Sequence, residues 1–319
     1  MGAHYQMTRL AIALGPRNPL VRVMLQRACR PHGADLRFAD SVVDIVKGDH
    51  VIRISARHFG YAPPLAAKFD HYFSQVEPSP DGSSLVVDYS APRLQKYRAS
   101  GLEFEVNSVP EEETAIDEYF RWYRPGPGDI VFDLGAYCGV STYFLSQCVG
   151  VTGRVYAFEP DATSHALLLR NMERHQLNNV IPLRLAVAAT SGRAEFLEEG
   201  ALGSVLSRLS SRPAMGIVSE VETITLAGAC DRFGVPSFVK MDIEGSEIEV
   251  LDSAREVLRS TYVQYALDTD HWVDGKQTTP AVERIFAECG YETMSSDQSG
   301  FMTTWARPNT SSHSPRNAP

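Results

Sequence analysis

The sequence predicts a doubly wound α/β domain with a mostly parallel sheet over residues 111–307, preceded by a smaller α+β region over residues 18–110. Short runs of β-branched and other apolar residues alternate with longer segments in which apolar residues recur every three or four positions. Glycines and acidic residues follow several of these short runs, where parallel sheets bind their ligands. The length of 319 residues and the hydrophobic content of 44% fit one catalytic domain with a smaller companion.

The first region contains helix and strand patterns but no chemical motif that we recognise. Val21, Met24, Leu25 and Ala28 recur at helical spacing until Pro31, which ends that helix. The other elements that we expect are a hairpin of 42–46 and 51–55, a helix over 65–76, and strands over 85–89 and 102–106. We expect this region to form a lid, a substrate wall or a dimer surface, and residues 1–17 and 308–319 to be tails.

The second region alternates strands and helices, which favours a parallel sheet covered on both faces. We expect strands over 129–134, 154–159, 181–187, 237–243 and 262–267, and helices over 140–148, 162–175, 247–258 and 280–289. Asp161 suits the N-cap of the second helix, and Pro280 suits the first position of the last one. Two final strands, near Tyr291 and over 301–305, are expected to pair as an antiparallel edge, and 200–219 is expected to be a loop.

A glycine-containing turn follows the first strand of this region in the pattern D-x-G-x-x-x-G. Gly135 and Gly139 allow the backbone to turn tightly and to approach a ligand closely. Glu159 ends the second strand, where a carboxylate can accept both hydroxyl hydrogens of a ribose. A dinucleotide site would use G-x-G-x-x-G, and the bulky Tyr137 leaves a pyrophosphate no easy place. S-adenosylmethionine, which carries no phosphate, is therefore favoured over a nicotinamide dinucleotide, with an oxidoreductase as the alternative.

The residues that we assign to cofactor binding are Asp133, Gly135, Ala136, Tyr137, Gly139, Glu159, Pro160 and Asp242.

Further motifs lie along the same region. Asp-Leu-Gly-Ala at 133–136, Ala-Phe-Glu-Pro at 157–160 and Asn171 are followed by Val-Lys-Met-Asp-Ile-Glu-Gly-Ser-Glu at 239–247. Over about 125–267 this set resembles the FkbM-type methyltransferases, whose signature K-x-D-x-E-G-x-E matches the last run. The chain departs from that family at Tyr137, where Asn or His is usual, and at Ala227, where Asp is usual.

This resemblance implies the Rossmann-like, seven-stranded sheet of class I methyltransferases and S-adenosylmethionine as the cofactor. It also implies O-methylation of a hydroxyl on a macrolide, a sugar or another natural product.

Two charged residues lie in the fourth strand, which we expect to be buried on both faces. Lys240 and Asp242 are two residues apart and therefore face the same side of the strand. They either neutralise each other as a structural pair or, as we expect, serve catalysis, with Asp242 facing the methyl donor or the acceptor. Ser246 and Glu249 have the spacing of a capping box, and Glu247 is expected to favour the helix dipole.

The fifth strand ends in Asp268, Asp270 and His271, beside the same edge of the sheet. His271 is our candidate for the general base, because its unperturbed pKa lies nearest neutrality. These residues and Asp242 could instead hold a divalent cation that lowers the pKa of the acceptor hydroxyl. We favour a site without a metal.

The overall charge argues against some partners. A net charge of −9 and a pI of about 5.5 make nucleic acid an unexpected substrate. The five cysteines do not have the spacing of a zinc site, and no apolar run is long enough to span a membrane. We therefore expect a cytoplasmic protein, which can form a homodimer. A homologue that binds the cofactor without catalysis is the remaining alternative.

Overall fold

The structure is a computed structural model that describes residues 14–198, 205–206, 217–273, 275–297 and 301–309. It divides into two compact units, one built mainly from 14–110 and the other mainly from 111–198 and 218–309. Most of the expected loop over 200–219 and most of the expected tails lie outside the described residues. Where that loop is described, the expectation is wrong for its last part, because Ile217 begins the strand β14 (Ile217–Ile224).

The first unit is an α+β fold around a five-stranded sheet of order β1-β2-β3-β5-β4. The predicted hairpin is confirmed, with β2 (Val42–Lys47) and β3 (His50–Ser55) antiparallel. The helix expected over 65–76 is instead two helices, because the backbone of Lys68 leaves the helical conformation between them. The remaining elements are α2 (Pro19–Cys29), η1 (Arg30–His32), β1 (Asp35–Phe38), η2 (Ala56–Tyr61), α3 (Ala62–Ala67), α4 (Phe69–Ser74), β4 (Ser79–Asp81), β5 (Ser84–Tyr89), β6 (Arg93–Lys96) and β7 (Glu103–Val106).

The second unit is built on a seven-stranded sheet of order β10-β9-β8-β15-β16-β20-β19. Its strands are β8 (Ile130–Leu134), β9 (Arg154–Phe158), β10 (Val180–Leu183), β15 (Phe238–Met241), β16 (Gln264–Asp268), β19 (Tyr291–Ser296) and β20 (Thr303–Pro308). All neighbours pair in parallel except β20, which is antiparallel to both β16 and β19. The predicted doubly wound, mostly parallel sheet is confirmed. The last two strands pair as expected, but β20 inserts beside β16 and leaves β19 alone at the edge.

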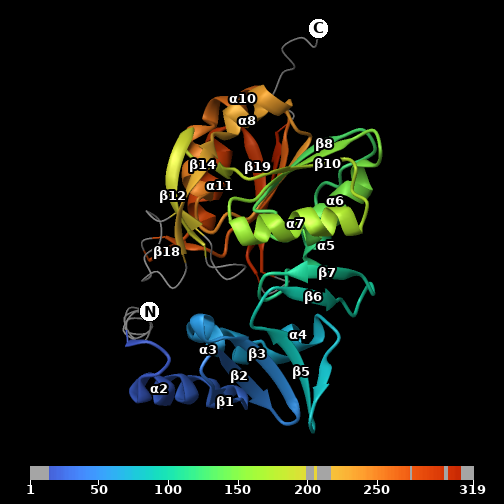
Figure 1. The fold of residues 1–319 in the computed structure, drawn as a ribbon. Helices are drawn as coiled ribbons and strands as arrows, with labels where there is room; N and C mark the ends of the chain where they lie inside the picture. The colour runs from blue at the N-terminus through green and yellow to red at the C-terminus, as the bar shows by residue number, and fades with distance from the viewer. Residues whose placement is uncertain (1–13, 199–204, 207–216, 274, 298–300, 310–319) are drawn as a thin grey trace. The chain divides into compact units, whose positions relative to one another are not determined.

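Helices cover both faces of this sheet, as Figure 1 shows for the green helices on one side and the orange ones on the other. One hydrophobic cluster joins Phe132 and Leu134 of β8 to α8 (Leu226–Phe233), α9 (Glu247–Ser253), α10 (Arg255–Ser260) and α11 (Thr279–Glu288). A second cluster joins Val131 to α5 (Ala115–Tyr119), α6 (Val140–Val149) and α7 (Ala162–Arg174). Alternate residues of the same strand therefore face opposite layers, which explains why its sequence is apolar apart from Asp133.

Three features of the second unit differ from the expected elements. The helix over 247–258 is two helices, because the backbone at Ala254 leaves the helical conformation. The strand over 181–187 splits, and β11 (Ala186–Val187) joins a separate sheet of order β11-β14-β12-β13, with β12 (Gly192–Glu198) and β13 (Val205–Leu206). A short hairpin of β17 (Trp272–Val273) and β18 (Lys276–Gln277) follows β16.

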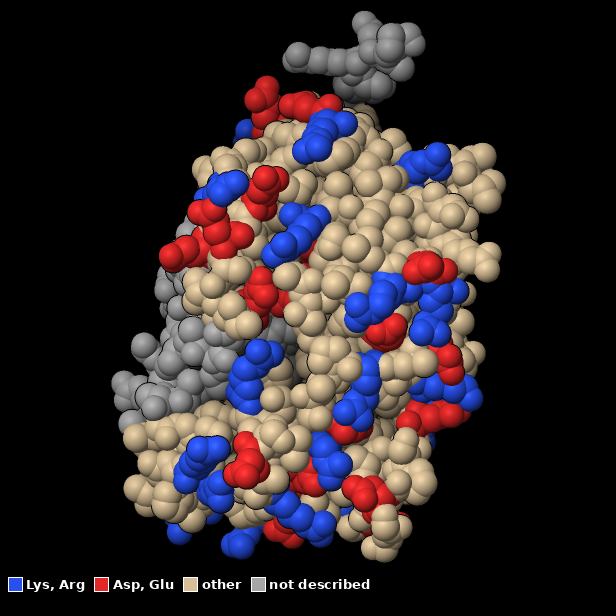
Figure 2. Space-filling view, viewed as in Figure 1, with Lys and Arg blue, Asp and Glu red and all other residues tan. Residues whose placement is uncertain are grey.

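Acidic and basic side chains are interspersed on the face drawn in Figure 2, without a broad patch of one sign. Within the described part of the chain, no helix is both long and apolar enough to cross a membrane.

Candidate active site

The order in which the chain adds strands to the sheet reverses between β8 and β15. The loops that follow these two strands are in close contact there. The chain passes from β8 outward through β9 and β10, and then returns to the other side of β8 at β15. Gly135 has φ +80°, and a Cβ at this position would lie 1.8 Å from the backbone oxygen of Asp242. The backbone N–H groups of Gly135 and Ala136 both donate to the carbonyl of Phe158. Such a switch point is where open α/β sheets bind ligands.

Asp133 and Lys240 lie opposite each other on β8 and β15, and both are completely buried. Asp133 accepts hydrogen bonds from the hydroxyls of Ser141 and Thr142, at 3.1 and 2.6 Å. The Lys240 ammonium lies 3.4 Å from Asp133 and donates to the Gly135 carbonyl at 2.8 Å. Burial alone would lower the pKa of Lys240, but Asp133 and the other nearby carboxylates hold it above its usual value.

This network bears on two interpretations of the sequence. The alternative of a structural pair between Lys240 and Asp242 is wrong, because the parallel register brings Lys240 together with Asp133 on the neighbouring strand. Asp133 has no surface from which to contact a cofactor, since its side chain is fully enclosed. Both residues instead hold the glycine loop in its shape.

Glu159 follows β9 directly and lies against the same loop. One carboxylate oxygen accepts the backbone N–H of Tyr137 and the other accepts that of Asp161, each at 2.8 Å. Tyr137 has a positive φ of 47°, an unusual conformation for a residue with a side chain, which is a form of local strain common at functional sites. Burial and the nearby Asp161 raise the pKa of Glu159 to about 8.

The remaining predicted cofactor residues complete this loop. The N–H of Gly139 donates to the carbonyl of Ala136, which closes the turn before α6. The side-chain amide of Asn171, on α7, donates to the carbonyl of Cys138 at 2.8 Å. Pro160 is half-buried and follows Glu159, so the chain brings all of these residues to one edge of the sheet.

A cluster of acids surrounds His271 after β16. The Nε2 atom of His271 lies 3.6 Å from Asp242 and 3.7 Å from Glu244, and Nδ1 lies 3.2 Å from Glu247. Asp268 is close as well, since one ligand atom each from Asp242, Asp268 and His271 lie within 4.8 Å of one another. This spacing is compatible with a divalent cation. Asp270 is exposed and accepts a hydrogen bond from Gln277.

The acids change the proton affinity of this histidine. Burial alone would lower the pKa of His271, but Glu247, Asp268 and Glu244 raise it well above its usual value. Burial also raises the pKa of Asp268, to about 7, although His271 opposes that shift. The sequence-based expectation that the pKa of His271 lies near neutrality is therefore wrong.

Glu247 has surroundings in the structure that its sequence position does not predict. The sequence predicts a charge in the first turn of the helix, and Glu247 does lie there, but its side chain is completely buried and pairs with His271. The expected capping box is also absent, because the Ser246 side chain makes no capping hydrogen bond to α9. The periodicity of α9 could have indicated this, since Val250 and Leu251 are buried one turn later on the same face as Glu247.

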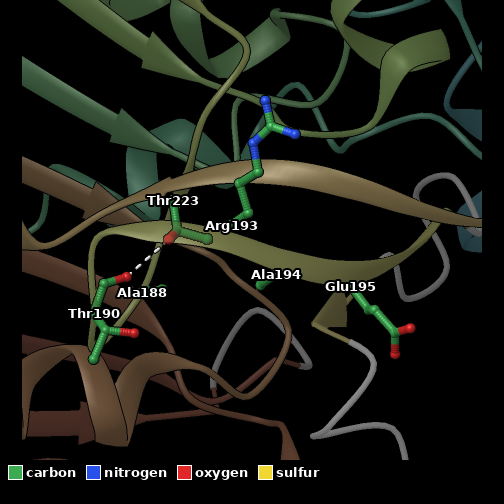
Figure 3. A pocket seen from close by; sticks show the side chains of 6 residues that line it. All are labelled: Ala188, Thr190, Arg193, Ala194, Glu195 and Thr223. Atoms are coloured by element: carbon green, nitrogen blue, oxygen red, sulfur yellow. Dashed lines mark hydrogen bonds between the residues drawn. The ribbon is translucent and has the colours of Figure 1, made fainter.

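A separate hollow lies on the four-stranded sheet (Figure 3). It is lined by Ala188, Thr190, Arg193, Ala194, Glu195 and Thr223. The hydroxyl of Thr223 donates to the carbonyl of Thr190, and Arg193 pairs with Glu220 at 2.6 Å. No predicted site residue lines this hollow. The predicted site residues lie instead at the ends of β8, β9, β15 and β16.

Comparisons with known proteins find similar methyltransferases. The chain is 28% identical over 153 residues to the hexuronic acid methyltransferase AglP of Haloferax volcanii, a match that covers 47% of this chain and 60% of that protein. Among solved structures, an FkbM methyltransferase from Methylobacillus flagellatus is similar, with 14% identity and a TM-score of 0.45, over 90% of this chain and 59% of that one. A precorrin-6y C5,15-methyltransferase from Geobacter metallireducens has 12% identity and a TM-score of 0.43, over 65% and 94%.

The model of the methyltransferase FkbM domain matches residues 133–293, which is just over half of the chain and includes the glycine loop, Glu159 and the acidic cluster. The chain therefore belongs to the FkbM family of methyltransferases.

Proposed function

We propose that this protein transfers a methyl group from S-adenosylmethionine to a hydroxyl of a small, sugar-like molecule. The observation that carries the proposal is the contact between the glycine loop after β8 and Asp242 after β15. Through this contact the glycine loop lies beside the acidic cluster. The chain also belongs to a methyltransferase family, which supports a methyl donor as the ligand of the loop.

The residues around the loop fit this cofactor. Gly135 keeps the backbone free of a Cβ at the closest approach of the two loops. Each oxygen of Glu159 accepts one backbone N–H, and each keeps a further lone pair that can accept a ribose hydroxyl. S-adenosylmethionine supplies an activated methyl group when bound. Gly135, Ala136, Tyr137 and Glu159 would hold it, while Asp133 and Lys240 fix the loop from within.

The acidic cluster supports a hydroxylated acceptor. Asp242 and Glu244 are partly exposed, at 34% and 27% of their side chains, so both can accept hydrogen bonds from the hydroxyls of a bound molecule. The relative from Haloferax volcanii is named for a hexuronic acid, which is a sugar derivative. The net charge of −9 favours a small molecule over a nucleic acid.

His271 is the residue that we propose to take the proton from the acceptor. The surrounding carboxylates stabilise the imidazolium that forms when the ring accepts a proton, as in other histidine–carboxylate pairs. The raised pKa has a cost, because only the neutral ring can act as a base. The rate of methyl transfer should therefore rise with pH through a pKa well above 6.5.

The experiment is methyl transfer from isotopically labelled S-adenosylmethionine to a panel of neutral sugars, uronic acids and amines. We expect label on oxygen atoms of a hydroxylated acceptor, with a single-turnover rate that rises in alkaline solution. Label found only on amines would overturn the O-methylation assignment. Protection from heat by NAD but not by S-adenosylhomocysteine would favour an oxidoreductase instead, and binding without any turnover would favour a non-catalytic homologue.

A further inference from the structure

We infer that Glu247 is a positioning residue, which holds the His271 ring in place for proton transfer and links it to the loop that carries Asp242. The inference rests on the proposed function, since it assigns a partner to the proposed base. It gives a chemical role to a carboxylate that helix geometry alone would assign to the helix dipole.

A single oxygen atom of Glu247 makes the link. Its Oε1 accepts the backbone N–H groups of Ile243 and Gly245, at 3.1 and 3.3 Å. The same atom lies 3.2 Å from Nδ1 of His271. The loop after β15 and the segment after β16 are thus joined through one buried carboxylate, at the base of the acidic cluster.

The two segments are also packed against each other. Gly245 has φ +99°, and a Cβ there would lie 2.9 Å from a side-chain methyl of Val273 and 3.9 Å from the Cβ of His271. The carbonyl of His271 accepts the N–H of Thr278 at 2.9 Å, which fixes its backbone. Because Nδ1 lies beside Glu247, the opposite ring nitrogen, Nε2, faces the partly exposed Asp242 and Glu244. The ring is therefore aimed at the side where an acceptor would bind.

The charges around His271 come from three places. Glu247 lies on α9, Asp242 and Glu244 lie in the loop before it, and Asp268 ends β16. Glu247 is completely buried, whereas Asp242 and Glu244 are partly exposed to water, which screens them. Although burial would raise the pKa of Glu247, His271 lowers it, so the pair favours carboxylate and imidazolium together. A buried charge without such a partner would be costly.

The variant Glu247→Gln separates this role from a purely structural one. Glutamine keeps an oxygen for the N–H groups of Ile243 and Gly245, but it brings no negative charge to His271. We expect the pKa of the His271 ring, followed by NMR and assigned with His271→Asn, to fall by about 1–3 units. This titration needs neither cofactor nor acceptor.

Turnover should respond in a matching way. In Glu247→Gln the pH–rate midpoint should move to lower pH, and the plateau rate should fall by up to the 10²–10⁴-fold that removing a general base costs. The affinity for S-adenosylhomocysteine and the KM for the acceptor should stay close to wild type. Asp252→Asn is the control, because it removes a carboxylate from the same helix at an exposed pair with Arg255.

A ring pKa and a pH–rate midpoint that are both unchanged in Glu247→Gln would overturn the inference. So would a double variant, Glu247→Gln with His271→Asn, whose loss is the sum of the two single losses, because linked residues should give no further loss. If Glu247→Gln does not fold, Glu247→Asp provides the test, since it keeps the charge but withdraws it from the ring. We then expect a lower plateau rate, and a wild-type rate contradicts us. If wild-type protein neither binds the cofactor nor methylates, the proposed function fails while the ring titration still tests the pair.

Discussion

The contact between the two loops makes Gly135 sensitive to the smallest possible change. In Gly135→Ala the new Cβ would lie 1.8 Å from the backbone oxygen of Asp242, whereas real Cβ atoms essentially never approach closer than 3.0 Å. The loops must therefore move apart by about 1.2 Å. The positive φ adds a strain of about 1–2 kcal/mol. A misplacement of about 1 Å can cost about 10²-fold in rate.

A second glycine separates the clash from the strain. Gly128 has a similar φ of +92°, but the nearest atom to its Cβ would be at 3.8 Å. We expect Gly128→Ala to lose stability through strain alone and to keep wild-type turnover and cofactor affinity. Gly135→Ala should lose both functions in addition, as measured by calorimetry with S-adenosylhomocysteine and by single-turnover methyl transfer. Wild-type affinity and rate in Gly135→Ala would show that this contact does not shape the site.

Four further predictions concern the charged residues of the site. His271→Ala should lower single-turnover methyl transfer by roughly 10²–10⁴-fold with cofactor affinity nearly unchanged, and a wild-type rate would remove His271 from the mechanism. A chelator should leave wild-type turnover intact, whereas loss of activity that magnesium or manganese restores would assign the acidic cluster to a metal. Lys240→Met should destabilise the fold by about 3–5 kcal/mol in denaturant titration, because it leaves Asp133 buried without its ion pair, and an unchanged midpoint contradicts this. Burial raises the pKa of Glu159 from 4.5 to about 8, so the carboxyl stays protonated to a higher pH in the folded state than in the unfolded state. This contribution to stability is present below about pH 4.5 and is lost as the pH rises through 8, and Glu159→Gln should flatten that part of the stability–pH curve.

The elements of the large sheet could be predicted because local pattern and burial agree there. Strands such as β8 are apolar apart from Asp133 because both faces of the sheet are covered. Helices such as α7 begin at a recognisable cap, Asp161, whose side chain accepts the N–H of Ser164. The four-stranded sheet could not be predicted in the same way. Its strand β12 carries Gly192, Arg193 and Glu195 and is largely exposed, so its sequence lacks the apolar alternation of a buried strand.

The site residues could be predicted only as far as strand order allows. Glu159 and Asp242 follow strands that end at one edge of the sheet, so their neighbourhood could be inferred from the alternation of elements. The partner of Lys240 depends on the register between β8 and β15, which no local pattern encodes. The shift of the His271 pKa depends on Glu247, Asp268 and Glu244, which come from three segments, and only the folded chain brings them together.

Calorimetric titration with S-adenosylhomocysteine tests whether the loop after β8 and Glu159 bind S-adenosylmethionine. We expect the wild-type protein to bind this product, and Glu159→Ala to bind it about 1–3 kcal/mol more weakly, the cost of leaving buried hydrogen-bonding groups without a partner. Gln264→Ala, which truncates a half-buried residue at the opposite end of β16, should bind as wild type does. No binding by the wild-type protein at millimolar ligand would exclude this cofactor, and an unchanged affinity in Glu159→Ala would exclude Glu159 from its site.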